Sequence, residues 1–176
     1  MAGDRISINR APVLTLWAAV VAERLGFDRE EALSLGKAVA GLTAQSKGRR
    51  LGIFAPSPEA VRKAREQKRS EQFWVELLGR HVPVINTPEG IRALNKAKPV
   101  DAVGVEKYLK GKFGDSLSAA RGAMSTMAKA FEPDQLANEA FRLYETFRPG
   151  VPEGVTGWGV KGELGLNRIR DLASKK

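Results

Sequence analysis

Cysteine is absent from the 176 residues of this sequence, and histidine occurs only once, as His81. The absence of cysteine excludes disulfide bonds, thiolate nucleophiles and zinc sites with cysteine ligands. A zinc site at His81 would need carboxylates as its other ligands, and no G-x-S-x-G motif indicates a serine hydrolase. We therefore predict no metal site and interpret His81 as a partly exposed capping residue.

The sequence also lacks an apolar run long enough to span a bilayer. The run at residues 11–22 has 12 residues, whereas a transmembrane helix needs about 20. The arginines before it resemble the start of a secretory signal, but Pro12 and Thr15 interrupt the run and the helix continues into the charged Glu23. We therefore expect no membrane contact, and the absence of cysteine agrees with a cytoplasmic location.

Nucleotide-binding motifs are absent or incomplete. No G-x-x-x-x-G-K-[ST] loop occurs, because Lys37 is followed by alanine. Gly157, Gly159 and Gly162 spell G-x-G-x-x-G, but the 14 residues after Gly162 are too few for the βαβ unit of a dinucleotide site. We expect these glycines to let the backbone fold around Trp158. The sequence therefore predicts no cofactor and no catalytic residue.

The overall composition of the chain is that of a globular protein. Hydrophobic residues make up 43% of the chain and charged residues 28%, which is typical neither of disordered nor of membrane-spanning chains. A chain of this length can bury a core and suits one domain. We expect a mostly α, single compact helical domain of about seven or eight helices, built on an N-terminal antiparallel helix pair.

The helix pair is the strongest structural signal in the sequence. Asn9 is a good N-cap, and the apolar residues among positions 13–25 cover most of the first helix, which is typical of a buried helix. Gly26 provides the C′ position that ends this helix. Asp28 and Glu31 have the capping-box spacing that begins the second helix. Because the link is so short, the two helices are predicted to run antiparallel.

The second predicted helix contains two interior glycines, Gly36 and Gly41. Each costs roughly 1 kcal/mol relative to alanine in a helix, so a packing reason is expected. We interpret them as the place where Ala18, Ala19 and Ala22 of the first helix approach closely. The alternative interpretation is that they make room for a ligand.

The rest of the chain is predicted to be mainly helical. The apolar residues of EQFWVELLG recur at spacings of three and four, so this stretch is expected to dock on the core as the second half of a helix that begins at Pro58. Residues 1–8 are interpreted as a short tail or a strand-like arm, and residues 81–85 as an edge strand or a linker. Further helices are predicted at residues 87–94, 101–113, 117–131 and 133–147, and after Asn167.

Two features divide the C-terminal half from the rest of the chain. Pro99 is the predicted internal boundary between a basic N-terminal half at residues 1–98, with the helix pair and a basic helix, and a neutral helical half at residues 99–176. We expect the two halves to pack as one domain. The Gly/Pro-rich stretch at residues 149–166 predicts an irregular loop before the C-terminal helix.

Positive charge is concentrated in one segment. The chain has a formal net charge of +9, and residues 47–69 contain eight basic residues against only Glu59 and Glu66, a net charge of +6. Clustered lysines and arginines gain affinity for phosphates by releasing counterions, and their spread around the segment favours contact with the backbone over base reading. The predicted nucleic-acid-binding residues are Lys47, Arg49, Arg50, Arg62, Lys63, Arg65, Lys68 and Arg69.

Three functional hypotheses follow from these patterns. The first is a protein that binds nucleic acid, duplex DNA in particular, through this segment; the simpler alternative for the same charges is a solvated helix face. The second is a helical interaction module that self-associates or binds an acidic protein partner. The third is an enzyme that uses the Trp158 loop and His81, for which no catalytic motif exists.

Overall fold

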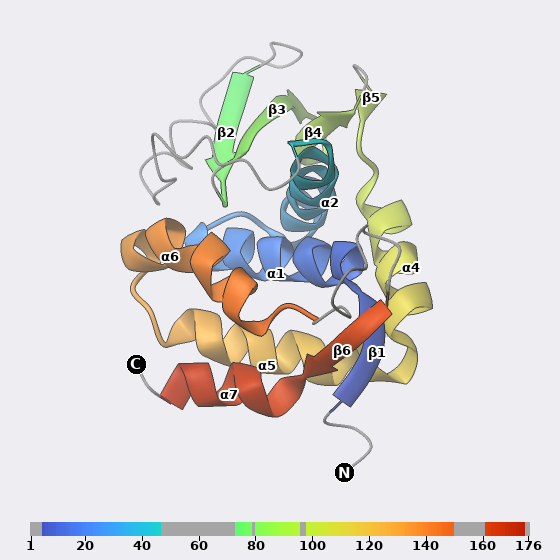
Figure 1. The fold of residues 1–176 in the computed structure, drawn as a ribbon. Helices are drawn as coiled ribbons and strands as arrows, with labels where there is room; N and C mark the ends of the chain where they lie inside the picture. The colour runs from blue at the N-terminus through green and yellow to red at the C-terminus, as the bar shows by residue number, and fades with distance from the viewer. Residues whose placement is uncertain (1–4, 47–72, 79, 96–97, 150–160, 175–176) are drawn as a thin grey trace.

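The computed structural model describes residues 5–46, 73–78, 80–95, 98–149 and 161–174 (Figure 1). The helices are α1 (Arg10–Leu25), α2 (Arg29–Ser46), α4 (Ala102–Phe113), α5 (Leu117–Lys129), α6 (Pro133–Phe147) and α7 (Leu166–Ser174), with a 3-10 turn, η2, at Gly114–Ser116. The strands are β1 (Arg5–Asn9), β2 (Phe73–Leu77), β3 (Arg80–Thr87), β4 (Gly90–Asn95), β5 (Lys98–Pro99) and β6 (Lys161–Gly165).

Helix α1 lies at the centre of the molecule, as its apolar circumference predicts (Figure 1). It packs against α2 on one side and against α5 and α6 on the other, and the four-stranded sheet in turn packs on α2. Trp17 is fully buried, and its Nε1 donates a hydrogen bond to the carbonyl oxygen of Ala140, 2.9 Å away. The Trp17 ring also meets the Phe147 ring edge-on, with 5.4 Å between the centroids. The prediction of a buried first helix is confirmed.

The predicted helix ends are largely confirmed. Gly26 has a φ of 124° and donates its N–H to carbonyls of the last turn of α1, as a C′ glycine does. At the start of α2, Glu31 N donates to Asp28 Oδ1 and Asp28 N donates to Glu31 Oε1, which is the predicted capping box. Asn9 occupies the N-cap position of α1 but makes no side-chain cap hydrogen bond.

Gly36 sets the close approach between α1 and α2. A Cβ atom at Gly36 would lie 2.4 Å from the carbonyl oxygen of Thr15 and 3.3 Å from the Cβ of Ala19. Figure 1 shows α1 from the side but α2 nearly end-on, so the two helices cross and are not aligned antiparallel along their length. The predicted close approach of the two helices is therefore confirmed at Gly36. It is not found at Gly41, where a Cβ would meet no described atom within 4 Å.

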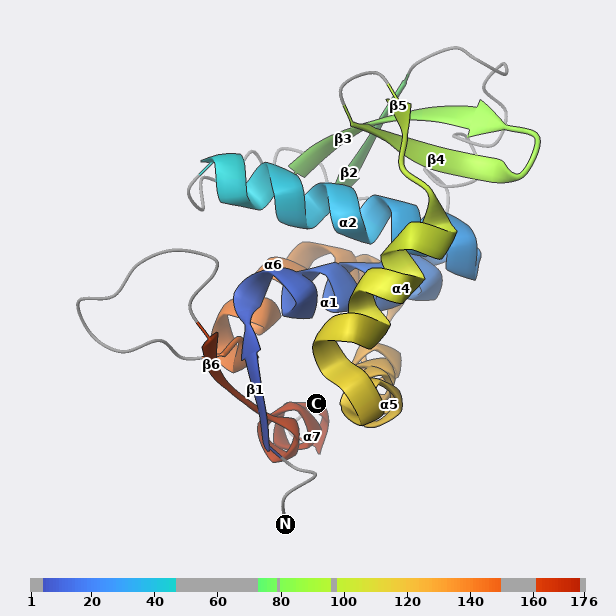
Figure 2. The same ribbon diagram turned by 90° about the vertical axis from the view of Figure 1, so that its right-hand side faces the viewer.

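A four-stranded antiparallel sheet replaces the helix predicted at residues 87–94 and the second half of the helix predicted from Pro58, whose first half lies outside the described residues. Its order is β2-β3-β4-β5, and it lies over α2 (Figure 2). Among the β2 residues whose burial is described, Trp74 is exposed while Val75 and Leu77 are buried. Such a period of two belongs to a strand, and the spacings of three and four in the same short stretch misled the prediction. The helix predicted at residues 87–94 is likewise wrong, because Thr87 and Gly90 close a two-residue turn between β3 and β4.

Strand β3 is an inner strand, contrary to the edge strand or linker predicted at residues 81–85. Pro83 pairs with Trp74 of β2, while the pairing with β4 begins only at Val84. Pro83 therefore lies beyond the last pair with β4. A proline can be accommodated there because its missing N–H breaks no bond of the β3-β4 ladder.

The outer edge of β4 is completed by side chains of α2 instead of a full strand. Strand β5 pairs only with Leu94 and Asn95 of β4. Before them, Ile91 N donates to Glu31 Oε2 over 2.9 Å, and Ala93 N donates to Ser34 Oγ over 2.8 Å. Both α2 side chains are fully buried. The helix thus provides the acceptors that a neighbouring strand would otherwise supply.

Arg92 closes the same contact region from β4. Its Nη1 donates to the carbonyl oxygen of Ile91, and its Nη2 donates to Glu30 Oε1 over 2.9 Å. The Ser34 hydroxyl in turn donates to the carbonyl oxygen of Val100. Gly90 has a φ of 123°, and a Cβ there would lie 3.1 Å from Glu31 Oε2, so the turn needs a glycine beside this carboxylate.

Strands β1 and β6 form a separate two-stranded antiparallel sheet. Ile6 pairs with Leu164 and Ile8 pairs with Gly162, and both isoleucines are buried. Of the two interpretations of residues 1–8, the strand-like arm is confirmed for residues 5–8, and residues 1–4 lie outside the described residues. Strand β6 occupies the end of the predicted Gly/Pro-rich loop, and residues 150–160 of that loop lie outside the described residues.

The C-terminal half supplies the remaining helices. Asp101 caps α4 by accepting a hydrogen bond from Val103 N at 3.2 Å. Met124 and Met127 of α5 are fully buried, so they fill the core. The predicted fold class is nevertheless wrong, because the described chain has six strands in two antiparallel sheets, and not seven or eight helices alone. Short strands carry too few residues for their period to outweigh an overlapping helical spacing. The division at Pro99 stays a prediction.

Candidate functional site

All eight predicted nucleic-acid-binding residues lie outside the described residues. Lys47, Arg49, Arg50, Arg62, Lys63, Arg65, Lys68 and Arg69 belong to the segment that connects the end of α2 to the start of β2. Their arrangement in space therefore stays a prediction. Trp158 and its neighbouring glycines at positions 157 and 159 also lie outside the described residues.

His81 is placed in β3, where its backbone pairs with Glu76 of β2. The cap interpretation is wrong, because His81 is the second residue of a strand and does not lie at a helix end. Within residues 5–46, 73–78, 80–95, 98–149 and 161–174, no three His, Cys, Asp or Glu residues come together in a way that could hold a metal ion. In the same ranges no helix is both long and apolar enough to cross a membrane.

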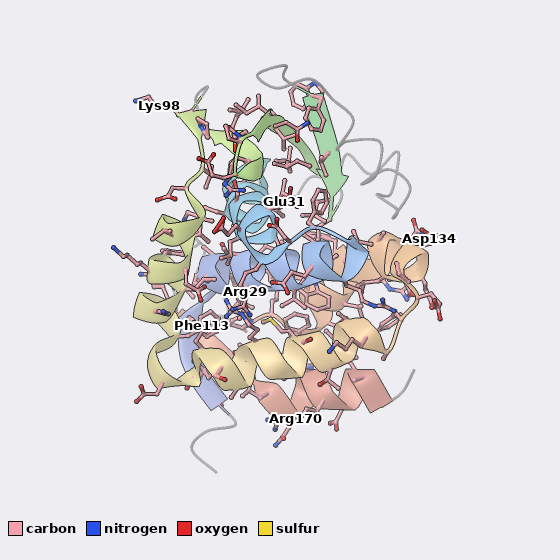
Figure 3. The ribbon with its side chains drawn as sticks, turned by 180° about the vertical axis from the view of Figure 1, so that it is seen from behind. Arg29, Glu31, Lys98, Phe113, Asp134 and Arg170 are labelled. Carbon is pink, nitrogen blue, oxygen red and sulfur yellow. The ribbon has the colours of Figure 1, made fainter. Side chains whose placement is uncertain are left out.

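A positively charged cavity lies between α1, α2 and α5. It has a volume of about 340 Å³, and we call it the arginine pocket. Figure 3 shows Arg29 between the ribbons of α1 and α5, where this cavity lies. Its lining contains four cations and one carboxylate; the lining residues are Val20, Glu23, Arg24, Arg29, Arg121, Ser125, Ala128 and Lys129.

Two of the four cations already have carboxylate partners. Arg121 makes a two-pronged contact with Glu106 of α4, with Nη2 3.0 Å from Oε2. The hydrogen bond from Arg121 lowers the pKa of the Glu106 carboxyl, and the nearby positive charge of Arg29 lowers it further. Arg29 Nε lies 3.7 Å from Glu23 Oε1, but both side chains are largely exposed to water, so this pair is loose.

The other two cations have no carboxylate partner among the described residues. Arg24 Nη2 donates to the carbonyl oxygen of Phe131 over 2.9 Å, while Arg24 Nε is buried without an acceptor. Lys129 and the Ser125 hydroxyl form no hydrogen bond or ion pair with any described residue. The pocket therefore combines unused donors with an excess of positive charge, which is suited to an anion.

A second basic cavity lies between α1, α6 and β6. It has a volume of about 540 Å³, and its lining includes Arg10, Arg148 and Arg168 together with Glu145 and Glu163. Arg10 Nε donates to the carbonyl oxygen of Pro149 over 2.8 Å. Burial lowers the pKa of Arg10, and the neighbouring Arg148 lowers it further. The two glutamates nearly balance the three arginines, so this cavity attracts an anion less than the arginine pocket does.

No protein-family model matches this chain, and no curated protein or solved structure is significantly similar to it. The functional argument therefore depends on the residues themselves.

An exposed tryptophan adjoins the predicted basic segment. Trp74 of β2 is 59% exposed, five residues after Arg69. The predicted position of Trp74 on a helix face that docks on the core is wrong. Trp74 lies directly opposite Pro83 of β3, so the two side chains share one face of the sheet and form an apolar pair there. Strand β2 is also the end strand of this sheet.

Sequence reasoning also missed the arginine pocket. Arg121, Ser125 and Lys129 follow one another at intervals of four on α5, which places them on one helix face. That spacing was a usable signal of a polar face opposite the apolar one. The partner residues Arg24 and Arg29 flank the link between α1 and α2. No local pattern joins the two sets, since they meet only through the packing of α1 against α5.

Proposed function

We propose that the protein binds nucleic acid, duplex DNA in the first instance, through phosphate contacts of residues 47–69. The observation that supports this function is the concentration of charge, with a net +6 of the chain's +9 in that segment. Duplex DNA is a dense line of phosphates, and binding to it releases condensed counterions. The described residues add a further basic surface at the arginine pocket.

A fluorescence anisotropy titration tests this function. The purified protein is titrated against several unrelated labelled duplexes at two salt concentrations. We expect binding to all of them at low salt and a steep loss of affinity at high salt, because phosphate contacts carry no sequence information. Absence of binding at low salt, or an affinity that salt does not change, would reject the function.

Replacing Arg49 and Arg50 by alanine is expected to weaken duplex binding and also to reduce the salt dependence of the affinity. Each lost phosphate contact lowers the slope of log affinity against log salt by about 0.9. The matched control replaces Arg142 and Arg170 by alanine. These residues are exposed on α6 and α7, and their replacement removes the same amount of positive charge. If the control lowers the slope as much as the test variant, general charge and not the segment governs binding.

The second candidate function is self-association or the binding of an acidic protein partner. The exposed Trp74 on the end strand β2 favours this candidate, since exposed tryptophans are enriched in protein interfaces. It predicts a molar mass that rises with protein concentration in light scattering, and no effect of DNA. The nucleic-acid function, in contrast, predicts that the protein binds DNA.

Replacing Trp74 by alanine is expected to change stability little, because the side chain is 59% exposed. If the second candidate holds, the same variant weakens association by at least about tenfold, as loss of an interface tryptophan typically does. Light scattering over a range of concentrations measures the association. Val103 is similarly exposed, at 58%, so Val103→Ala serves as the control. An equal effect of the two variants would contradict a specific role of Trp74.

We further propose that the protein acts in the cytoplasm. The absence of cysteine is consistent with a reducing compartment. Fractionation of the producing cells tests this: recovery of the protein in an extracellular or membrane fraction would refute it.

A further inference from the structure

We propose that the arginine pocket binds a phosphate group, carried either by a small phosphate ester or by a nucleic-acid backbone. This site is distinct from residues 47–69 and does not depend on the function proposed above. Helices α1, α2 and α5 all contribute to the pocket, so its geometry is fixed by the core packing.

The charge of the pocket matches that of a phosphate. Its lining has four cations and one carboxylate, and Glu106 behind Arg121 adds a second carboxylate. A net charge of +2 is left, and it resides mainly on Arg24 and Lys129, which have no carboxylate partner in the described chain. A phosphate monoester has a charge of about −1.5 to −2 at neutral pH.

The unused donors match the acceptor oxygens of a phosphate. Arg24 lines the cavity and contributes its positive charge, whereas its buried Nε is not open to a ligand. Lys129 Nζ and the Ser125 hydroxyl are two donors in the same lining that have no partner among the described residues. Charge-assisted hydrogen bonds to phosphate oxygens are among the strong ones.

The walls and volume of the pocket further narrow the ligand. Val20 and Ala128 form an apolar part of the lining, which reduces screening by water and strengthens each charge interaction. The volume of about 340 Å³ is at the lower end of the range for small-molecule sites, about 300–1,000 Å³. It leaves room for the group to which the phosphate is attached.

The α2 N-terminus does not account for this site. The capping box occupies the backbone N–H groups of Asp28 and Glu31, and the carboxylates of Glu30 and Glu31 in the first turn oppose the binding of an anion there. Side-chain charges, and not a helix end, therefore provide the attraction.

Titration calorimetry of the full chain with inorganic phosphate, at constant ionic strength, tests the proposal. Lys129→Gln and Arg24→Gln are each expected to weaken phosphate binding about tenfold, the effect of losing one charged hydrogen bond. Glu23→Gln removes the one carboxylate of the lining and is expected to tighten it. Arg142→Gln is the matched control, because Arg142 is 74% exposed on α6 and lies outside the pocket.

The proposal is overturned if phosphate does not bind saturably, or if Arg142→Gln weakens binding as much as Lys129→Gln does. Lys129 is exposed and unpaired among the described residues, so its loss leaves the fold intact. A short duplex identifies the source of the phosphate. A backbone phosphate predicts that Lys129→Gln also weakens duplex binding, while a small ester predicts that it does not. Replacing Arg49 and Arg50 leaves inorganic phosphate binding unchanged in both cases.

Discussion

Gly36→Ala is expected to destabilise the protein by about 2–3 kcal/mol, the cost of overpacking a well-packed core. The new Cβ atom would lie 2.4 Å from the backbone oxygen of Thr15 and 3.0 Å from the backbone nitrogen of Ala19. Backbone atoms cannot rotate away as the end of a side chain can, so α2 must move away from α1. The thermal unfolding midpoint is expected to fall by roughly 5–10 °C, as measured by circular dichroism.

Gly41→Ala is the control for this experiment. It makes the same chemical change on the same helix, but its Cβ meets no described atom within 4 Å. Alanine is a better helix former than glycine, so this variant is expected to gain about 0.5–1 kcal/mol. The two variants should therefore change stability in opposite directions. Destabilisation by both, to the same extent, would show that the contact at Thr15 is not what limits the α1-α2 approach.

Glu31→Ala is expected to cost about 3 kcal/mol or more. Glu31 is fully buried, with Oε1 accepting from Asp28 N at 3.0 Å and Oε2 accepting from Ile91 N at 2.9 Å. Alanine leaves the buried Ile91 N–H without its acceptor, which costs about 1–3 kcal/mol, and removes the capping box at the exposed Asp28, which costs about 0.5–2 kcal/mol more. Urea unfolding measures the stability, and hydrogen exchange of the Ile91 amide is expected to become faster than in the parent protein.

Glu89→Ala is the control for the loss of a carboxylate. Glu89 is exposed in the turn between β3 and β4; its backbone N donates to Thr87 Oγ1, and its carboxylate bonds no described residue. Its removal is expected to change stability by less than about 0.5 kcal/mol. If Glu31→Ala is as mild as Glu89→Ala, the carboxylate does not hold α2 to the sheet.

The helices could be predicted wherever the apolar period ran long and the ends had recognisable caps. Residues from Asn9 to Glu31 meet both conditions, and Asp101 does so for α4. The four-stranded sheet could not be predicted in the same way. Its inner face is made of short alternations such as Val75 and Leu77, and its outer edge is completed by Glu31 and Ser34, which lie far away in sequence.

The candidate sites also differ in whether their residues are close in sequence. A charge cluster that is continuous in sequence, such as residues 47–69, is visible without a structure. The arginine pocket is not, because Arg24 and Arg29 join Lys129 only after α1 has packed against α5. The exposure of Trp74 was equally hidden, since it depends on which face of β2 meets the core.

The pairing of β1 with β6 has a consequence for biosynthesis. Ribosomes make β1 well before its ladder partner at residues 161–165. During that interval Ile6 and Ile8, which end up buried, have no strand to pair with. In the nascent chain β1 therefore remains unpaired, with its apolar side chains uncovered by β6, until translation has passed β6. Only then can the two-stranded sheet form.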